Sequence, residues 1–277
     1  MNCQFSFGPN RSYFVTAGSV FAWSDDTLPP DLVRILEDED LDCPYDVGLP
    51  MEPEHYTISW RTTSGEDWYE DERLGPNYTR LARFIQIAAT AGSHTTLTTF
   101  GPNHSFFSLT PTGYSWQNIP PCLEEDIQRC LQVRRPSAVA LGVQRTFIVI
   151  YSDGGLKYEL GGEYPLVELI FRNEEETKRR GGVAYVALNP FIAGEFYLVY
   201  GDGRTLWNFP PEWSEDVAAV STAIRPRPSR GEKIKMKAPS SEPEPTVCVL
   251  QQSDTEPSEM EKEVEEGEVL DITLQPT

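Results

Sequence analysis

FGPNRSYFV at residues 7–15 returns as FGPNHSFF at residues 100–107, and these two stretches decide the fold. A third version, LGVQRTFIV, occupies residues 141–149, and a looser one, LNPFIAGEFYLV, occupies residues 188–199. After each version come a turn, an aromatic residue, and a proline preceded by an apolar residue. A weaker copy, with YTISWR at residues 56–61, lies between the first two. Self-similarity at a fixed period is the sequence signature of a repeat architecture.

The prolines that close the copies set the period. They are Pro29, Pro76, Pro120, Pro165 and Pro210, spaced 47, 44, 45 and 45 residues apart. The aromatic residues that precede them are Trp23, Trp68, Trp116, Tyr158 and Trp207. The chain is therefore predicted to contain five units of about 45 residues.

Each unit has the same internal plan, which is clearest in the fourth. Residues 137–141 are apolar, and residues 146–151 are rich in β-branched and aromatic side chains, so both are predicted strands. The Gly-Pro-Asn between such strands predicts a turn, because glycine accepts a positive φ and the ring of proline fixes the φ angle of that residue. Ser-Asp-Gly at residues 152–154 predicts a hairpin into a third strand, residues 156–158.

A short amphipathic helix should follow each proline. In residues 29–36, Leu32, Ile35 and Leu36 have the i, i+3, i+4 spacing of one helix face. In residues 121–131, the corresponding face carries Leu123, Ile127, Cys130 and Leu131. Proline suits the first helical turn because its missing N–H is not needed there.

These units predict a mainly β fold of five three-stranded meanders, each with a short helix. One unit cannot bury its apolar face alone, so the units must stack. A five-bladed β-propeller satisfies this and hides its terminal edges, whereas an open repeat stack exposes them. Over residues 1–223 the repeat resembles tandem repeats in proteins of filamentous fungi. That resemblance implies a propeller-like repeat style and no activity, and the Trp-Asp and Gly-His marks of WD40 repeats are absent.

Charge and composition limit the partners. The 277 residues include 23 Lys+Arg and 43 Asp+Glu, for a formal charge of −20. Phosphates and anionic membranes would be repelled, so nucleic-acid and membrane binding are disfavoured. No apolar run approaches the ~20 residues that span a bilayer, and the N-terminus lacks the pattern of a secretory signal. Five cysteines without ligand spacing indicate buried free thiols, and we expect an intracellular protein, nuclear or cytoplasmic.

The composition changes near residue 224. Residues 224–237 are basic with prolines, and residues 238–277 are rich in Glu, Ser and Pro. We therefore expect a repeat domain at 1–223 and a disordered tail at 224–277, which cannot bury enough apolar surface to fold. The tail holds 7 Lys+Arg against 12 Asp+Glu, which leaves 16 against 31 in the repeats.

Two apolar islands interrupt this tail. They are Val247, Cys248, Val249 and Leu250, and then Val269, Leu270, Asp271 and Ile272. Both are flanked by acids or serines and resemble SUMO-interacting motifs, which implies binding of SUMO by strand addition. Ser241, Ser253 and Ser258 each precede a glutamate by three residues, the pattern that acid-directed kinases favour. The alternatives are that the islands are chance, or that one is a strand completing the ring.

The basic run has two interpretations. Arg225, Arg227, Arg230, Lys233, Lys235 and Lys237 could form a nuclear-import patch. Glu232 lies inside the run, and a solvated linker would need no function.

No complete catalytic, metal or cofactor signature occurs. His55, His94 and His104 lack metal-ligand spacing, and the acidic run at residues 37–42 lacks the glycine of a calcium loop, so surface and loop roles are expected. The repeated aromatics indicate a core between blades, with sugar-binding platforms as the alternative. The function predicted is that of a monomeric, non-enzymatic protein-interaction scaffold. The alternatives are a glycan-binding propeller and, with no carboxylate pair singled out, a glycosidase-type hydrolase.

Overall fold

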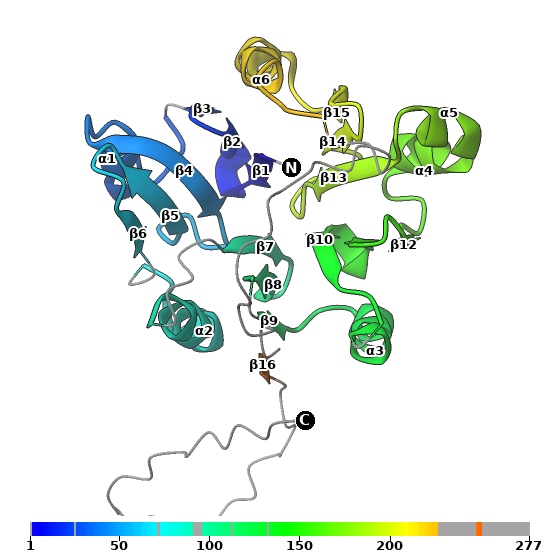
Figure 1. The fold of residues 1–277 in the computed structure, drawn as a ribbon, viewed down its shortest axis with the longest axis horizontal. Helices are drawn as coiled ribbons and strands as arrows, with labels where there is room; N and C mark the ends of the chain where they lie inside the picture. Colours follow the sequence, from blue (N-terminus) through cyan, green and yellow to red (C-terminus); the bar gives the residue numbers. More distant parts are fainter. Residues whose placement is uncertain are drawn as a thin grey trace, which may run out of the picture.

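The computed structural model describes residues 2–24, 26–70, 73–90, 96–111, 113–131 and 133–226, with backbone alone at Thr90 and at residues 248–250. These residues are mainly β and form five antiparallel meanders around a common centre, with helices at the periphery (Figure 1). We number the sheets 1 to 5 along the chain. The prediction of five three-stranded units, each with a helix, is confirmed.

The strands follow the predicted plan closely. Sheet 1 contains β1 (Cys3–Phe7), β2 (Tyr13–Ala17) and β3 (Val20–Trp23). Sheet 2 contains β4 (Leu41–Gly48), β5 (Thr57–Thr62) and β6 (Asp67–Glu70). Sheet 3 contains β7 (Leu97–Gly101), β8 (Ser105–Leu109) and β9 (Gly113–Gln117). Sheet 4 contains β10 (Pro136–Leu141), β11 (Phe147–Tyr151) and β12 (Leu156–Glu159). Sheet 5 contains β13 (Val183–Leu188), β14 (Phe196–Tyr200) and β15 (Thr205–Asn208).

The helices begin at or just after the periodic prolines. They are α1 (Pro30–Leu36), α2 (Thr79–Thr90), α3 (Pro121–Cys130), α4 (Pro165–Arg172) and α6 (Ser214–Ser221), with short 3-10 turns at Pro76–Tyr78 and Pro211–Trp213 leading into α2 and α6. A further helix, α5 (Glu174–Arg179), was not predicted. Its side chain–backbone cap, in which Asn173 accepts from the Glu176 amide, explains its start.

The helices that follow the periodic prolines fill the wedges between one sheet and the next, whereas α5 has no buried residue. Leu32 of α1 packs in a cluster with Phe14 of sheet 1 and Ile58 of sheet 2. Leu123 of α3 packs with Phe107 of sheet 3 and with sheet 4 in the same way. The wedge helix thus supplies the apolar surface that a three-stranded sheet lacks.

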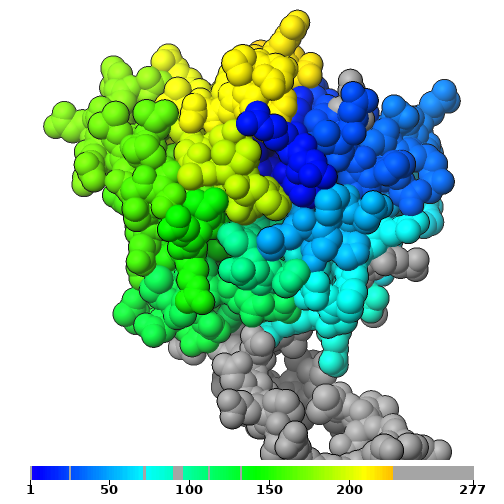
Figure 2. Space-filling model, turned by 180° about the vertical axis from the view of Figure 1, so that it is seen from behind, coloured from blue at the N-terminus to red at the C-terminus, as the bar shows by residue number. Residues whose placement is uncertain are grey.

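The wedge filled by α6, between sheet 5 and sheet 1, joins the two ends of the repeat region. The first strands contact one another in a cycle, β1 with β4, β4 with β7, β7 with β10, β10 with β13, and β13 with β1. The Tyr185 hydroxyl of β13 donates to the Phe5 carbonyl and accepts from the Phe5 amide, both at 3.0 Å. Tyr13 donates to Asp216 of α6 at 3.3 Å. Figure 2 shows the N-terminal residues lying directly against those of the last unit.

The repeated turn differs from the prediction in one respect. Gly8 is extended, with φ −121°, and the positive φ angles fall on Asn10 and Arg11. The Ser12 amide donates to the Pro9 carbonyl at 3.0 Å, which closes a turn of the primed type. Glycine is required here for close approach, since a Cβ at Gly8 would lie 2.2 Å from Ser12 Oγ.

One short strand belongs to the predicted tail. β16 (Cys248–Leu250) pairs in parallel with β9, with Val249 opposite Tyr114, and so adds a fourth strand to the outer edge of sheet 3. Among the described residues, no helix is long and apolar enough to cross a membrane.

Candidate binding site

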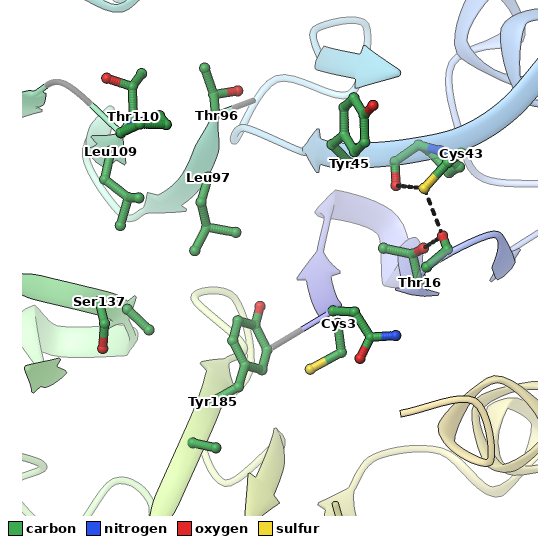
Figure 3. A pocket seen from close by; sticks show the side chains of 16 residues that line it. Cys3, Thr16, Cys43, Tyr45, Thr96, Leu97, Leu109, Thr110, Ser137 and Tyr185 are labelled. Atoms are coloured by element: carbon green, nitrogen blue, oxygen red, sulfur yellow. Dashed lines mark hydrogen bonds between the residues drawn. The ribbon is translucent and has the colours of Figure 1, made fainter. Parts of the chain in front are cut away.

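The ring has a pocket of about 550 Å³ on its axis, near the N-terminal ends of the five first strands. Figure 3 shows its walls converging from separate sheets. All five sheets contribute: the lining includes Cys3 and Thr16, Cys43 and Tyr45, Leu97 and Leu109, Ser137 and Ala138, and Ala184 and Tyr185. The site exists only because the five units meet.

Among the residues that the structure describes, none of those lining the pocket is charged, although the chain as a whole is strongly acidic. Its polar groups are bonded within the protein. Thr16 Oγ1 donates to the Gly18 carbonyl and Ser137 Oγ to the Ile150 carbonyl, both at 3.0 Å. Tyr45 donates to Asp67 Oδ1 at 2.6 Å. Since these groups already have partners within the protein, the pocket offers mainly shape and apolar surface.

Two thiols line the pocket and are held in the neutral form. Burial raises the pKa of Cys3 to about 12. Burial, followed by the neighbouring charge of Asp42, raises the pKa of Cys43, and its Sγ donates to the Gly18 carbonyl at 3.0 Å. The described cysteines are free, as predicted, but they are half-buried rather than buried. In the reduced, neutral state they act as part of an apolar wall.

A buried carboxylate lies beside the pocket wall. Asp46 of β4 is only 1% exposed. Gln4 Nε2 donates to its Oδ1, while Thr96 Oγ1 at 3.1 Å and the Thr98 amide at 2.9 Å donate to its Oδ2. Thr96 also lines the pocket. Burial raises the pKa of Asp46 to about 7, and the three donors limit the rise.

A second buried acid shows the opposite behaviour. Asp126 of α3 accepts from Tyr151 and pairs with Arg129 Nη2 at 2.6 Å and Lys157 Nζ at 2.9 Å. Burial alone would raise its pKa, but these donors and cations lower it to about 2. Ionised Asp126 therefore anchors α3 to sheet 4.

The two described histidines share one carboxylate at the far ends of the first strands. Glu52 Oε1 lies 2.9 Å from His104 Nδ1, and Glu52 Oε2 lies 4.0 Å from His55 Nδ1. Burial opposes ionisation of Glu52, but the hydrogen bond from Asn77 and the proximity of His104 lower its pKa. These contacts join sheet 2 to the turn of sheet 3. Within the described ranges, no group of His, Cys, Asp and Glu could hold a metal ion.

The five repeated aromatics are not equivalent. Trp116 is 2% exposed and donates to Glu124 Oε1 at 2.9 Å, and Trp207 stacks on Phe209 at 5.7 Å between centroids. Trp68, in contrast, is 51% exposed and stacks on Trp60. The core interpretation therefore suits Trp116, and one sugar platform per unit is wrong at that position.

Most predicted tail residues lie outside the described part of the chain. These are Arg227, Arg230, Lys233, Lys235, Lys237, Ser241, Val247, Ser253, Ser258, Val269, Leu270, Asp271 and Ile272, as well as His94 of the repeat region. The Arg225 amide donates to Asn2 Oδ1 at 3.0 Å, which ties the end of the repeat region to the pocket lining. Of the first island, the backbone of Cys248, Val249 and Leu250 forms β16.

The pocket was missed in the sequence, although its first-strand residues occupy one shared repeat position with a different side chain in most units. Five residues before the repeated turn glycine, or before Asn189 in the fifth unit, lie Cys3, Cys43, Thr96, Ser137 and Ala184. Asp46 did leave a signal in the sequence, because it is a charged residue two positions before the turn glycine, where the other units have the uncharged Ser6, Thr99, Ala140 and Ala187. Comparison with known proteins yields no match to a family model, a curated protein or a solved structure.

Proposed function

We propose that the repeat region is a five-bladed β-propeller that acts as a non-enzymatic protein-interaction module. The cyclic contacts of the first strands and the wedge helix between sheets 5 and 1 support this assignment. A closed ring leaves no open terminal sheet, which suits a monomer.

The observation that carries the proposal is the neutral axial pocket lined by all five sheets. Its volume of about 550 Å³ falls in the range of ~300–1,000 Å³ typical of ligand sites. We assign it to an apolar group of a protein partner, such as a protruding aliphatic or aromatic side chain. The free thiols support a reducing compartment, nuclear or cytoplasmic.

A charge placed in the pocket should abolish binding. Leu97 and Leu109 face each other across sheet 3, are half-buried and line the pocket, so a glutamate is tolerated there better than in the core. Leu109→Glu should weaken binding of the neutral apolar dye Nile red at least tenfold, measured by fluorescence titration of the full chain. Leu206→Glu on β15, where Leu206 is already exposed, is the matched control. Equal dye affinity in all three proteins would contradict the assignment.

We propose further that the tail binds SUMO through its two apolar islands. The β-strand formed by Cys248–Leu250 against β9 supports the strand-forming character of the first island. Val269→Ala combined with Ile272→Ala should abolish pulldown of a SUMO chain by the full-length protein. Leu109→Glu should leave that pulldown intact, which separates the tail from the pocket. If wild-type protein captures no SUMO chain, this part of the proposal is wrong.

Two alternative functions have less support. A glycan-binding surface would have to rest on Trp68 and its stacked neighbour Trp60 rather than on a ring of platforms. A glycosidase needs paired carboxylates, and among the described residues no carboxylate lines the axial pocket.

A further inference from the structure

Asp46 connects three sheets directly beside the axial pocket. Its oxygens accept hydrogen bonds from Gln4 Nε2 of β1 and from the Thr98 amide of β7. They also accept one from Thr96 Oγ1, immediately before β7. Gln4 is itself fixed, since its Oε1 accepts from the Val47 amide at 2.9 Å and its Nε2 donates to the Val47 carbonyl at 3.1 Å. We call Asp46, Gln4, Thr96 and Thr98 the axial cluster.

No cation balances this carboxylate among the described residues. The groups that face it come from four sheets. Gln4 of β1, Thr96 and Thr98 bond it directly, Ser59 of β5 reaches it by way of Thr96, and Tyr185 of β13 lies near it. Each is neutral near pH 7, and burial raises the pKa of the Tyr185 phenol. Ionised Asp46 is therefore stabilised by hydrogen bonds alone, in contrast to Asp126 with its two cations.

The cluster can hold the proton without losing a partner. A proton on Asp46 Oδ2 donates to Thr96 Oγ1, whose own hydroxyl then turns to Ser59 Oγ, 3.2 Å away. The Thr98 amide still donates to Oδ2, and Gln4 still donates to Oδ1. Protonation thus reverses the direction of one hydroxyl pair, and Thr96, the residue that turns, is part of the pocket wall.

We propose that the axial cluster is a proton-operated clasp of the pocket: it holds the first strands of sheets 1, 2 and 3 together when Asp46 is neutral and loosens the wall at Thr96 when Asp46 is ionised. This regulation rests on the proposed binding function of the pocket. The geometry that carries it is a buried carboxylate that bridges three sheets, shares a hydroxyl with the cavity and has no cation beside it in the described ranges.

The direction of the pH effect follows from the burial of Asp46, which is 1% exposed and has no described cation beside it, so that the charged form is disfavoured and the pKa rises to about 7. An unfolded aspartate releases its proton near pH 3.9, whereas the folded chain keeps the proton up to about pH 7. The stabilising contribution of neutral Asp46 is therefore complete below about pH 4 and is lost as the pH rises through about 7. Across that window the folding constant should fall by up to about tenfold per pH unit.

The test compares three full-length proteins: wild type, Asp46→Asn and Asp126→Asn. Urea denaturation gives the folding constant of each protein at pH 5.5 and at pH 8.5. Between these pH values the constant of the wild type should fall about 30-fold more than that of Asp46→Asn, which has no proton to release at this position. Asp126→Asn is the matched control, since that acid stays ionised at both pH values. The Asp126→Asn protein should be less stable than wild type at both pH values but should keep the wild-type dependence of stability on pH.

Hydrogen exchange and Nile red binding then separate the clasp from the binding function. Protection of the Thr98 amide, corrected for intrinsic exchange, should fall at least tenfold between pH 5.5 and 8.5 relative to sheet 5 amides, and dye access should rise with it. The clasp is supported if this fall in protection disappears in Asp46→Asn and persists in Asp126→Asn. If that result is obtained but no protein binds the dye, only the proposed binding function fails. An identical pH dependence in wild type and Asp46→Asn would overturn the clasp.

Discussion

Val217→Asp is expected to unfold the whole ring, whereas Ala218→Asp, one position along the same helix, should leave it folded. Val217 of α6 is 0% exposed and lies in the wedge between sheets 5 and 1. A carboxylate at that position has no partner, and an unpaired buried charge is among the changes that cost about 4 kcal/mol or more. Ala218 is exposed, so the same charge remains in water.

The damage should spread because, in the proposed closed ring, each sheet is supported by both of its neighbours. α6 contacts β2 and β3 of sheet 1, and Tyr197 of sheet 5 lies 4.9 Å from Phe5 of sheet 1 between ring centroids. Once this wedge is lost, both neighbouring sheets expose an apolar face, and the next wedge has a sheet on one side only. We therefore expect one cooperative transition rather than the loss of a single unit.

Denaturation followed by circular dichroism and by hydrogen exchange measures this cooperativity. In Val217→Asp, sheets 2 to 4 should lose protection together with sheets 5 and 1. If sheets 2 to 4 keep wild-type protection, the units stack as an open array and the closed-ring proposal is wrong. A wild-type midpoint for Val217→Asp would show that α6 does not close the ring.

Local patterns in the sequence were sufficient to predict the units themselves. The predicted strand at residues 146–151 matches β11 at Phe147–Tyr151, and the predicted helix at residues 121–131 matches α3 at Pro121–Cys130. Both follow from period and turn chemistry, which act over a few residues. The helix α5 was missed because its six residues are polar and none is buried, so it has no apolar periodicity to detect.

The axial site could not be predicted in the same way. The side chains that meet there, such as Cys3 and Tyr185, are up to 182 residues apart in sequence. The first strands supply them from equivalent positions, but their types differ from unit to unit, as Cys3, Thr96 and Ala184 do. They come together only when the fifth sheet reaches the first. The repeat pattern rests on the residues that the units have in common, whereas the chemistry of this site comes from shared positions at which the residue types differ.

Gly101→Ala is the second change expected to have a large effect, and it tests the tight contact between neighbouring sheets. A Cβ at Gly101 would lie 2.5 Å from Ser105 Oγ and 2.7 Å from Leu141 Cβ. Leu141 belongs to β10 and is 1% exposed, so its Cβ cannot turn away without moving the backbone of sheet 4. Overpacking of this kind costs about 3 kcal/mol.

Gly155→Ala provides the matched control, because its new Cβ would meet Arg134 Nη1 at 2.8 Å and Asp153 Oδ1 at 2.9 Å, the mobile ends of side chains. It should change the free energy of unfolding by less than about 1 kcal/mol, measured by urea denaturation. Gly101 and Gly8 both occupy the glycine of the repeated Phe-Gly-Pro-Asn, and a Cβ at Gly8 would likewise approach the next sheet, at 2.9 Å from Leu49 Cδ1. If Gly101→Ala were as stable as Gly155→Ala, the repeated glycine would not mark the seam between sheets, and its recurrence would need an explanation in the turn alone.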